Sequence, residues 1–302
     1  MISRRNLLQS GILCLSSTLI PSRPLIAKDT SRPFGISLAQ WSVNRLIFEG
    51  ELTTLDFPAL ARNEFGIDAV EYVNTLFLDK AADEEHLRSL RKRAADEGVR
   101  NLLIMCDREG RLGDPDATLR RKAVENHFKW VDAATFLGCH SVRVNASSEG
   151  SRDEQKSLAA DGLHQLCEYA DSAGINVLVE NHGGLSSDAS WLVGVMQATD
   201  HPRVGTLPDF GNFQVSETER YDPYQGVAEM MPYAKAVSAK SHDFDDDGNE
   251  ADLDYHRLMR IVLDAGYRGY VGIEYEGKRL SEFDGIRATQ LLLESIRDEV
   301  GE

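Results

Sequence analysis

The feature that most constrains this chain is an alternation, repeated eight times from Phe34 onward, of a short β-rich apolar run with a segment of helical period. Such an alternation is typical of βαβ units with parallel strands. The runs predict strands at 34–41, 69–72, 101–106, 141–145, 176–179, 205–208, 236–239 and 270–273. Helical periodicity is clearest at 85–97, 116–136, 153–172, 254–265 and 281–298.

Glycine marks the ends of several of these helical segments. Gly98, Gly138, Gly174 and Gly266 each follow the last helical residue, where a left-handed C-terminal cap favours glycine. In the final segment, an apolar stripe is predicted to pack on the strands, and it comprises Ile286, Leu291, Leu292 and Ile296.

Polar or aromatic residues stand at the ends of the eight predicted strands, and successive ones are 29 to 37 residues apart. This spacing is about one βα unit each time. We therefore predict an α/β fold, a single-domain (β/α)8 TIM barrel, with a doubly wound open sheet as the alternative, because periodicity does not show closure. In a barrel these residues would meet at one mouth, and they are Trp41, Glu71, Asp107, Arg143, Glu180, Asp209, His242 and Glu274.

The N-terminus has the pattern of a targeting signal. Ser3-Arg4-Arg5 precedes a modestly apolar run over 7–20 and a Pro/Ser-rich stretch that ends near Ala27, which resembles a twin-arginine export signal. A frayed basic N-terminus is the alternative. The run is shorter than the ~20 apolar residues that cross a bilayer, so stable membrane insertion after signal removal is not expected. We predict an export signal and linker over 1–30, a barrel over 31–302, and a periplasmic or otherwise exported protein.

The chain is strongly acidic. Its formal net charge is −16, and removal of residues 1–27, which hold three Arg and no acid, would make it −19. Such a surface repels phosphate backbones, so we expect no nucleic-acid partner. Of the four cysteines, Cys14 lies in the predicted signal, which leaves Cys106, Cys139 and Cys167. These three lack metal-type spacing, and their odd number argues against a disulfide framework. We expect them to be small buried apolar side chains.

Four of the strand-end residues have the chemistry of metal ligands. Glu180, Asp209, His242 and Glu274 follow the last four predicted strands. Three carboxylates in one mouth would repel one another without a cation. Oxygen ligands with one nitrogen suit Mn²⁺, Mg²⁺ or Co²⁺, with Zn²⁺ as an alternative, and Mn²⁺ is our first choice. Individually, each acid could instead be a helix cap and the histidine a surface residue.

Several sequence blocks now identify a family resemblance. The chain from about Phe34 onward resembles the xylose-isomerase-like sugar phosphate isomerases and epimerases, and most closely their exported members. That family also contains ketose 3-epimerases, inosose dehydratases and 2-keto-inositol isomerases. The blocks that carry the resemblance, in barrel order, are WSVNR, AVEYVN, RVNAS, VENHGG, LPDFGNF, SAKSHDF and GYRGYVGIEYEG.

The resemblance implies one divalent metal ion held by Glu, Asp, His and Glu of the last four strands, which are Glu180, Asp209, His242 and Glu274. It also implies that Glu180 and Glu274 act as base and acid on a sugar or polyol. A divalent ion that binds a carbonyl and the neighbouring hydroxyl acidifies the adjacent C–H and stabilises an enediolate. Epimerisation, isomerisation and β-elimination are all compatible with such a site, and a homo-oligomer remains open.

Further residues could complete the site. Lys240 shares a strand face with His242 and could donate to a substrate oxygen, and His182 could contact substrate or orient a ligand. We also expect substrate contacts from six residues at the strand ends or in the loops that follow them: Arg143, Asn145, Asp107, Glu71, Asn212 and Trp41. For each of these the alternative is a structural role in a loop.

The sequence departs from the ketose 3-epimerase pattern at Asn212, where that pattern has His, and at Gly248, where it has Arg. These changes argue against simple ketose 3-epimerisation. We therefore predict a metal-dependent isomerase or epimerase that acts on a keto-sugar or polyol through an enediolate. The alternative is a lyase or dehydratase that acts by β-elimination on a 3-keto-glycoside or inosose. A sugar-binding barrel without activity and a DNA-repair endonuclease are the rival classes, and the acidity argues against the second.

Overall fold

Eight parallel strands lie side by side in one sheet. The computed structural model describes residues 32–301. The strands follow one another around the sheet in the order β6-β5-β4-β3-β2-β1-β8-β7. Their bounds are β1 Gly35–Ala39, β2 Ala69–Val73, β3 Arg100–Met105, β4 Ser141–Val144, β5 Asn176–Glu180, β6 Val204–Leu207, β7 Val237–Ser241 and β8 Tyr270–Tyr275.

The sheet closes between β6 and β7 through isolated bridges rather than a full ladder. Bridges join Thr206 to Ala234 and Asp209 to Ser238. Three backbone hydrogen bonds cross the same seam: Lys235 N donates to Thr206 O at 3.1 Å, Ser238 N donates to Pro208 O at 2.9 Å, and Phe210 N donates to Ser238 O at 3.1 Å. The chain is therefore an α/β TIM barrel, and the open doubly wound sheet is excluded.

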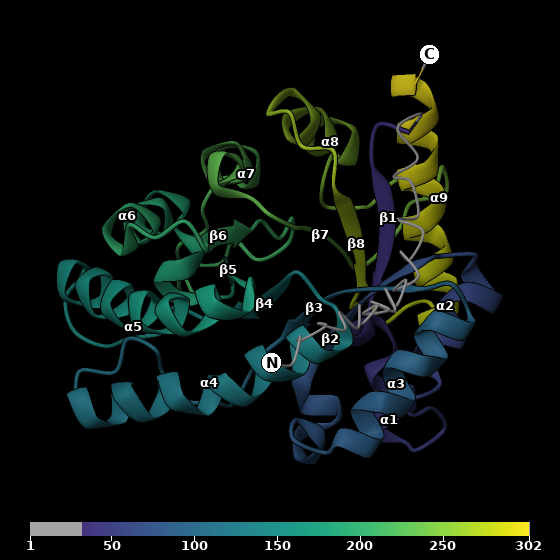
Figure 1. Cartoon of the computed structure of the whole chain (residues 1–302). Coiled ribbons are helices and arrows are strands. Elements are labelled where there is room, and N and C mark those ends of the chain that lie inside the picture. Colours follow the sequence, from purple (N-terminus) through teal and green to yellow (C-terminus); the bar gives the residue numbers. More distant parts are fainter. Residues whose placement is uncertain (1–31, 302) are drawn as a thin grey trace, which may run out of the picture. The chain divides into compact units, whose positions relative to one another are not determined.

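Helices follow the strands and surround them (Figure 1). The α-helices are α1 Asn44–Phe48, α2 Phe57–Phe65, α3 Glu84–Asp96, α4 Ala117–Leu137, α5 Arg152–Ala173, α6 Ala189–Thr199, α7 Pro223–Met230, α8 Tyr255–Asp264 and α9 Glu282–Gly301. Short 3-10 helices are η1 Gln40–Val43, η2 Asn74–Leu76, η3 Leu78–Lys80, η4 Gly184–Ser187 and η5 Met231–Tyr233.

Local capping explains why these helices begin and end where they do. Ser151 and Glu154 form a capping box at the start of α5, which satisfies backbone donors that the helix leaves free. The four predicted C-terminal glycines all have the left-handed backbone, with φ from 67° at Gly98 to 84° at Gly266. That conformation is strained for residues with a Cβ, so these positions favour glycine.

The predicted helix and strand bounds agree with the structure to within about three residues at each end. One apolar position was wrong: Leu291 is 66% exposed, whereas Leu293, which was not predicted, is buried. Leu293 lies seven residues after Ile286 and so returns to the same face of α9, while Leu291 falls on the opposite face. Cys106, Cys139 and Cys167 are buried and free, as expected.

A small apolar cluster fills the barrel interior, apart from the main core between strands and helices. Its members include Leu178, Leu207 and Ala236. Side chains two residues apart share a face of a strand, so Glu180, Asp209 and Ser238 follow these residues one layer nearer the mouth. The apolar layer thus supports a polar layer at the carboxyl ends of the strands.

The predicted export signal and linker over 1–30 lie outside the described residues. Within 32–301, no helix has the length and apolar character needed to span a membrane.

Candidate metal and substrate site

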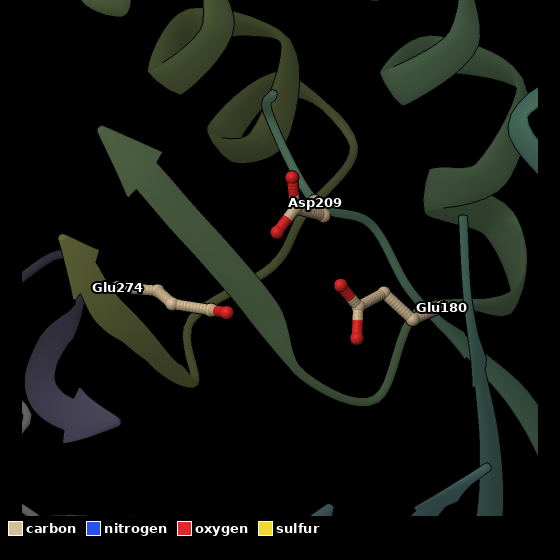
Figure 2. Close-up of side chains that lie close together, drawn as sticks. All are labelled: Glu180, Asp209 and Glu274. Atoms are coloured by element: carbon tan, nitrogen blue, oxygen red, sulfur yellow. The ribbon is translucent and has the colours of Figure 1, made fainter. Parts of the chain in front are cut away.

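Three buried carboxylates meet at the barrel mouth. Glu180 ends β5, Asp209 follows β6 and Glu274 lies in β8. One oxygen of each lies within 4.8 Å of those of the others, and this is the one such group of potential metal ligands in residues 32–301. Figure 2 shows the three side chains pointing toward a common space from separate segments. Three of the four predicted ligands are therefore brought together.

Asp209 is held by the loop that follows it. Its Oδ1 accepts hydrogen bonds from the backbone N–H of Gly211 at 2.8 Å and of Asn212 at 2.9 Å. The side chain of Asn181 donates to the backbone oxygen of Asp209 at 2.9 Å and accepts from its N–H at 2.8 Å. Sequence reasoning missed Asn181, although it directly follows Glu180 in the block VENHGG.

Glu180 is positioned by two partners from neighbouring segments. Asn212 Nδ2 donates to Glu180 Oε1 at 2.9 Å. Arg143 Nε lies 2.8 Å from Glu180 Oε2, but the pair is not aligned as a hydrogen bond, so this buried carboxylate oxygen has no hydrogen-bond partner among the described residues. This oxygen is ion-paired but retains hydrogen-bonding capacity, so it could also coordinate a cation.

Glu274 lies beside Ser238 and Lys240 of β7. Ser238 Oγ is 3.0 Å from Glu274 Oε2 and also 3.0 Å from Asp209 Oδ2. Lys240 Nζ is 3.2 Å from Glu274 Oε1 and 3.6 Å from Asp209 Oδ2. Ser238 was not predicted, although it lies two residues before Lys240 and so on the same strand face.

These charges perturb one another. Burial raises the pKa of Asp209 well above its ordinary value, and the carboxylates of Glu180 and Glu274 add to this effect. Burial also acts to raise the pKa of Glu274, but the neighbouring ammonium of Lys240 and guanidinium of Arg143 outweigh it, so that pKa is lowered. A divalent cation bound here would offset the repulsion between the carboxylates and favour their ionised forms.

His242, the fourth predicted ligand, lies outside the group of three carboxylates. It is partly exposed, just past the end of β7. Its backbone N–H donates to Glu250 Oε1 at 3.2 Å. The residues of β7 in contact with the carboxylates are Ser238 and Lys240. The role of His242 as a ligand stays a prediction.

The donor set nevertheless fits a hard divalent cation. Carboxylate oxygens are the ligands that Mg²⁺ and Mn²⁺ prefer. Glu180, Asp209 and Glu274 would hold such an ion.

A second set of predicted residues forms a polar rim beside this group. Asp107 Oδ1 accepts from Arg143 at 2.9 Å and from Asn145 Nδ2 at 2.8 Å. Burial acts to raise the pKa of Asp107, but Arg143 reverses this, so that pKa is lowered. Asn145 Oδ1 is buried without a hydrogen-bond partner among the described residues. This oxygen could accept a hydrogen bond from a substrate hydroxyl.

The remaining predicted residues are less closely joined to the carboxylates. His182 is exposed after β5, and its backbone N–H donates to Ser186 Oγ at 3.0 Å. Trp41 is half-buried in η1 and makes an edge contact with Phe48, with ring centroids 6.2 Å apart. Glu71 is fully buried inside the barrel, where Ser37 Oγ donates to its Oε1 at 2.6 Å.

Comparison with known proteins gives one family. The family model described as "Xylose isomerase-like TIM barrel" matches residues 59–298. A crystal structure of a xylose isomerase-like TIM barrel protein from Mycobacterium smegmatis, in complex with magnesium, superposes with a TM-score of 0.65 at 19% sequence identity. The superposition covers 88% of this chain and 97% of that one. At this identity the likeness shows the fold alone.

Two curated relatives match shorter stretches. A C-glycoside deglycosidase alpha subunit from Arthrobacter globiformis is 39% identical over 60 residues, which are 20% of this chain and 17% of that protein. A fructoselysine 3-epimerase from Shigella flexneri is 22% identical over 177 residues, which are 53% of this chain and 60% of that protein. The chain thus spans less than two thirds of the length of either relative.

Proposed function

The chain belongs to the xylose isomerase-like TIM barrel family, and from this premise we propose that it is a metal-dependent sugar isomerase or epimerase acting on a keto-sugar or polyol. The observation that carries the proposal is the convergence of Glu180, Asp209 and Glu274 at the barrel mouth. The similarity to a fructoselysine 3-epimerase supports the reaction class. We propose Mn²⁺ as the native ion, with Mg²⁺, Co²⁺ or Zn²⁺ as alternatives.

In the proposed reaction, the position of each residue at the mouth determines its role. When bound, a divalent ion would polarise the substrate carbonyl and make the neighbouring C–H more acidic. Glu180 and Glu274 stand on separate strands, so one can remove a proton from a carbon between them and the other can return one. Return to the opposite face of the same carbon gives an epimer, and return to the adjacent carbon gives an isomer.

The polar rim would orient the sugar. Arg143 and Asn145 are held together by Asp107, and the free Oδ1 of Asn145 can accept from a hydroxyl. The buried guanidinium of Arg143 also keeps Glu180 fixed, which favours a defined direction of proton transfer.

The alternative is a lyase that uses the same groups. Loss of a leaving group β to the carbonyl, in place of reprotonation, would give elimination from a 3-keto-glycoside or inosose. The local similarity to a C-glycoside deglycosidase alpha subunit favours keeping this reaction as the second candidate.

Solvent isotope exchange distinguishes the isomerase or epimerase reaction from the lyase reaction. The Mn²⁺-loaded protein is incubated with a panel of keto-sugars and 3-keto-glycosides in D₂O and followed by NMR and ultraviolet absorption. Deuterium at the carbon next to the carbonyl, without new unsaturation, supports the isomerase or epimerase, whereas an enone chromophore supports the lyase. Glu274→Gln should lose turnover, while the exposed control Glu217→Gln should keep it. Full turnover in Glu274→Gln would exclude the assigned proton transfer.

We also propose that the protein is exported. Arg4→Lys together with Arg5→Lys should hold the protein in the cytoplasm if the N-terminus is a twin-arginine signal. Unchanged distribution between cytoplasm and periplasm in cell fractions would contradict this proposal.

A further inference from the structure

Lys240 places a positive charge among the three carboxylates. It pairs in register with Glu274 across β7 and β8, and it is only 3% exposed. Its Nζ is 3.2 Å from Glu274 Oε1 and 3.6 Å from Asp209 Oδ2. At this level of the barrel, β7 therefore contributes a cation to the group rather than a metal ligand.

Neighbouring residues hold the side chain of Lys240 toward the carboxylates. A Cβ built on Gly211 would lie 3.2 Å from both Cγ and Cδ of Lys240, so the loop after Asp209 packs closely on the lysine stem. The hydroxyl of the buried Tyr255 donates to the backbone oxygen of Lys240 at 2.6 Å. These contacts therefore hold the ammonium group of Lys240 in a defined position at the barrel mouth.

Lys240 also has a second partner at the edge of the group. Glu276 Oε1 lies 2.7 Å from Nζ, which is the shortest of the three contacts. The Glu276 side chain is 32% exposed, and it is not one of the three grouped carboxylates. Nζ can therefore withdraw from Asp209 and Glu274 while it keeps its hydrogen bond to Glu276, so the ammonium would not be left unpaired.

An ammonium and a divalent ion cannot share the same oxygens without strong repulsion. A divalent ion bound by Asp209 and Glu274 would sit about 2.1 Å from their oxygens, which are the oxygens that Lys240 approaches. The ammonium of Lys240 and the divalent ion would then lie close together in a buried site, where like charges repel far more than in water. Arg143, the other buried cation nearby, is occupied by Glu180 and Asp107.

We propose that Lys240 competes with the divalent cation for the carboxylates. The three carboxylates bind the cation only as the ammonium withdraws from Asp209 and Glu274 and keeps Glu276 as its partner. The proposal rests on the proposed function in that a divalent cation binds this group. It adds that metal affinity is set by an exchange between two cations, and that Glu276 determines how readily the exchange occurs.

The experiment measures Mn²⁺ binding rather than turnover. The full chain is freed of metal by chelation and titrated with Mn²⁺ by calorimetry, with free Mn²⁺ followed by electron paramagnetic resonance. Lys240→Met should bind Mn²⁺ at least tenfold more tightly than the parent protein, because the competing charge is gone. Glu276→Gln should bind several-fold more weakly, because the displaced ammonium loses its partner. The exposed control Lys278→Met should stay within twofold of the parent protein.

Other outcomes separate the two proposals. Unchanged or weaker binding in Lys240→Met, while the parent protein binds Mn²⁺, would overturn the competition and leave the metal-dependent function standing. Absence of binding to Mn²⁺ and Mg²⁺ in every form would overturn both. Circular dichroism checks that each variant is folded, and Lys240→Gln carries the same expectation if Lys240→Met does not fold.

Discussion

Arg143 is a buried guanidinium that holds two carboxylates of the mouth, Glu180 and Asp107. Removing one partner of a buried ion pair leaves the other charge buried and unpaired. We expect Arg143→Met to lower the free energy of unfolding by about 3 kcal/mol, and Arg143→Lys to lower it by less because the charge remains. Urea denaturation of the chelated proteins measures both. Equal stability of Arg143→Met and the parent protein would show that this pair has no net stabilising effect.

Glu71 gives a second prediction at the scale of one residue. Burial raises its pKa from 4.5 to about 7. In the unfolded chain Glu71 would ionise near its ordinary pKa, whereas the folded protein keeps the proton up to the raised value. The folded state therefore binds more protons between these pKa values, and stability falls as the pH rises through this window.

A raised pKa of this size corresponds to about 3 kcal/mol lost between pH 4.5 and pH 7. Glu71→Gln cannot ionise, so its stability should fall less over the same window. Urea denaturation at half-unit pH steps measures the difference between the two curves. Parallel curves would mean that Glu71 is not the group responsible.

The residues of the site were predictable to different degrees. Glu180, Asp209 and Glu274 could be predicted because strand ends of a parallel barrel converge, and the structure brings them together. The choice between Lys240 and His242 could not be made in the same way, since both lie on one face of a strand by the two-residue period. Which of them is level with Glu274 depends on strand register, and register is set by contacts between strands far apart in sequence.

At the scale of elements, the packing of α5 on the loop after β3 depends on Gly162. A Cβ at this position would lie 1.8 Å from the backbone oxygen of Leu112. Ala is ordinarily favoured over Gly inside a helix by about 1 kcal/mol. Here we expect the opposite sign, because α5 or the loop must shift: Gly162→Ala should destabilise the fold by about 1–3 kcal/mol.

Gly194 in α6 is the matched control. A Cβ there would meet only Lys156 Cδ, at 3.3 Å, and that flexible side chain can move. Gly194→Ala should therefore raise the free energy of unfolding by a few tenths to about 1 kcal/mol. Thermal and urea unfolding of both variants test the pair. Stabilisation by Gly162→Ala would show that α5 is not held against that loop.

The elements themselves were predictable from local signals. The signals that define a helix or strand are local in sequence: alternating apolar runs, capping residues and terminal glycines lie within about ten residues of the element that they define. The bounds of α4 and α5 could therefore be predicted closely. Leu291 was misplaced because adjacent leucines leave the phase of a helix ambiguous, and only packing against the strands resolves it.

At the scale of the whole molecule, closure of the barrel was beyond what periodicity could show. The strands from β6 around to β7 form continuous ladders, but the β6–β7 seam rests on isolated bridges. Asp209 lies at the end of β6, and Glu274 lies in β8 beside β7, so the carboxylate group spans this seam. The candidate metal site therefore lies at the seam where isolated bridges, rather than a ladder, join adjacent strands.

Metal removal should consequently affect the seam more than the rest of the barrel. An ion that binds only the folded chain stabilises it by about 2.7 kcal/mol at one hundred times its dissociation constant. Because that ion would be held from both sides of the seam, we expect Mn²⁺ to slow hydrogen exchange at the amides of Phe210 and Ser238 more than at those of β4. Exchange measured by mass spectrometry or NMR, with and without a chelator, tests this. Equal slowing in every strand would mean that the ion stabilises only the fold as a whole, and no slowing would mean that these carboxylates do not bind it.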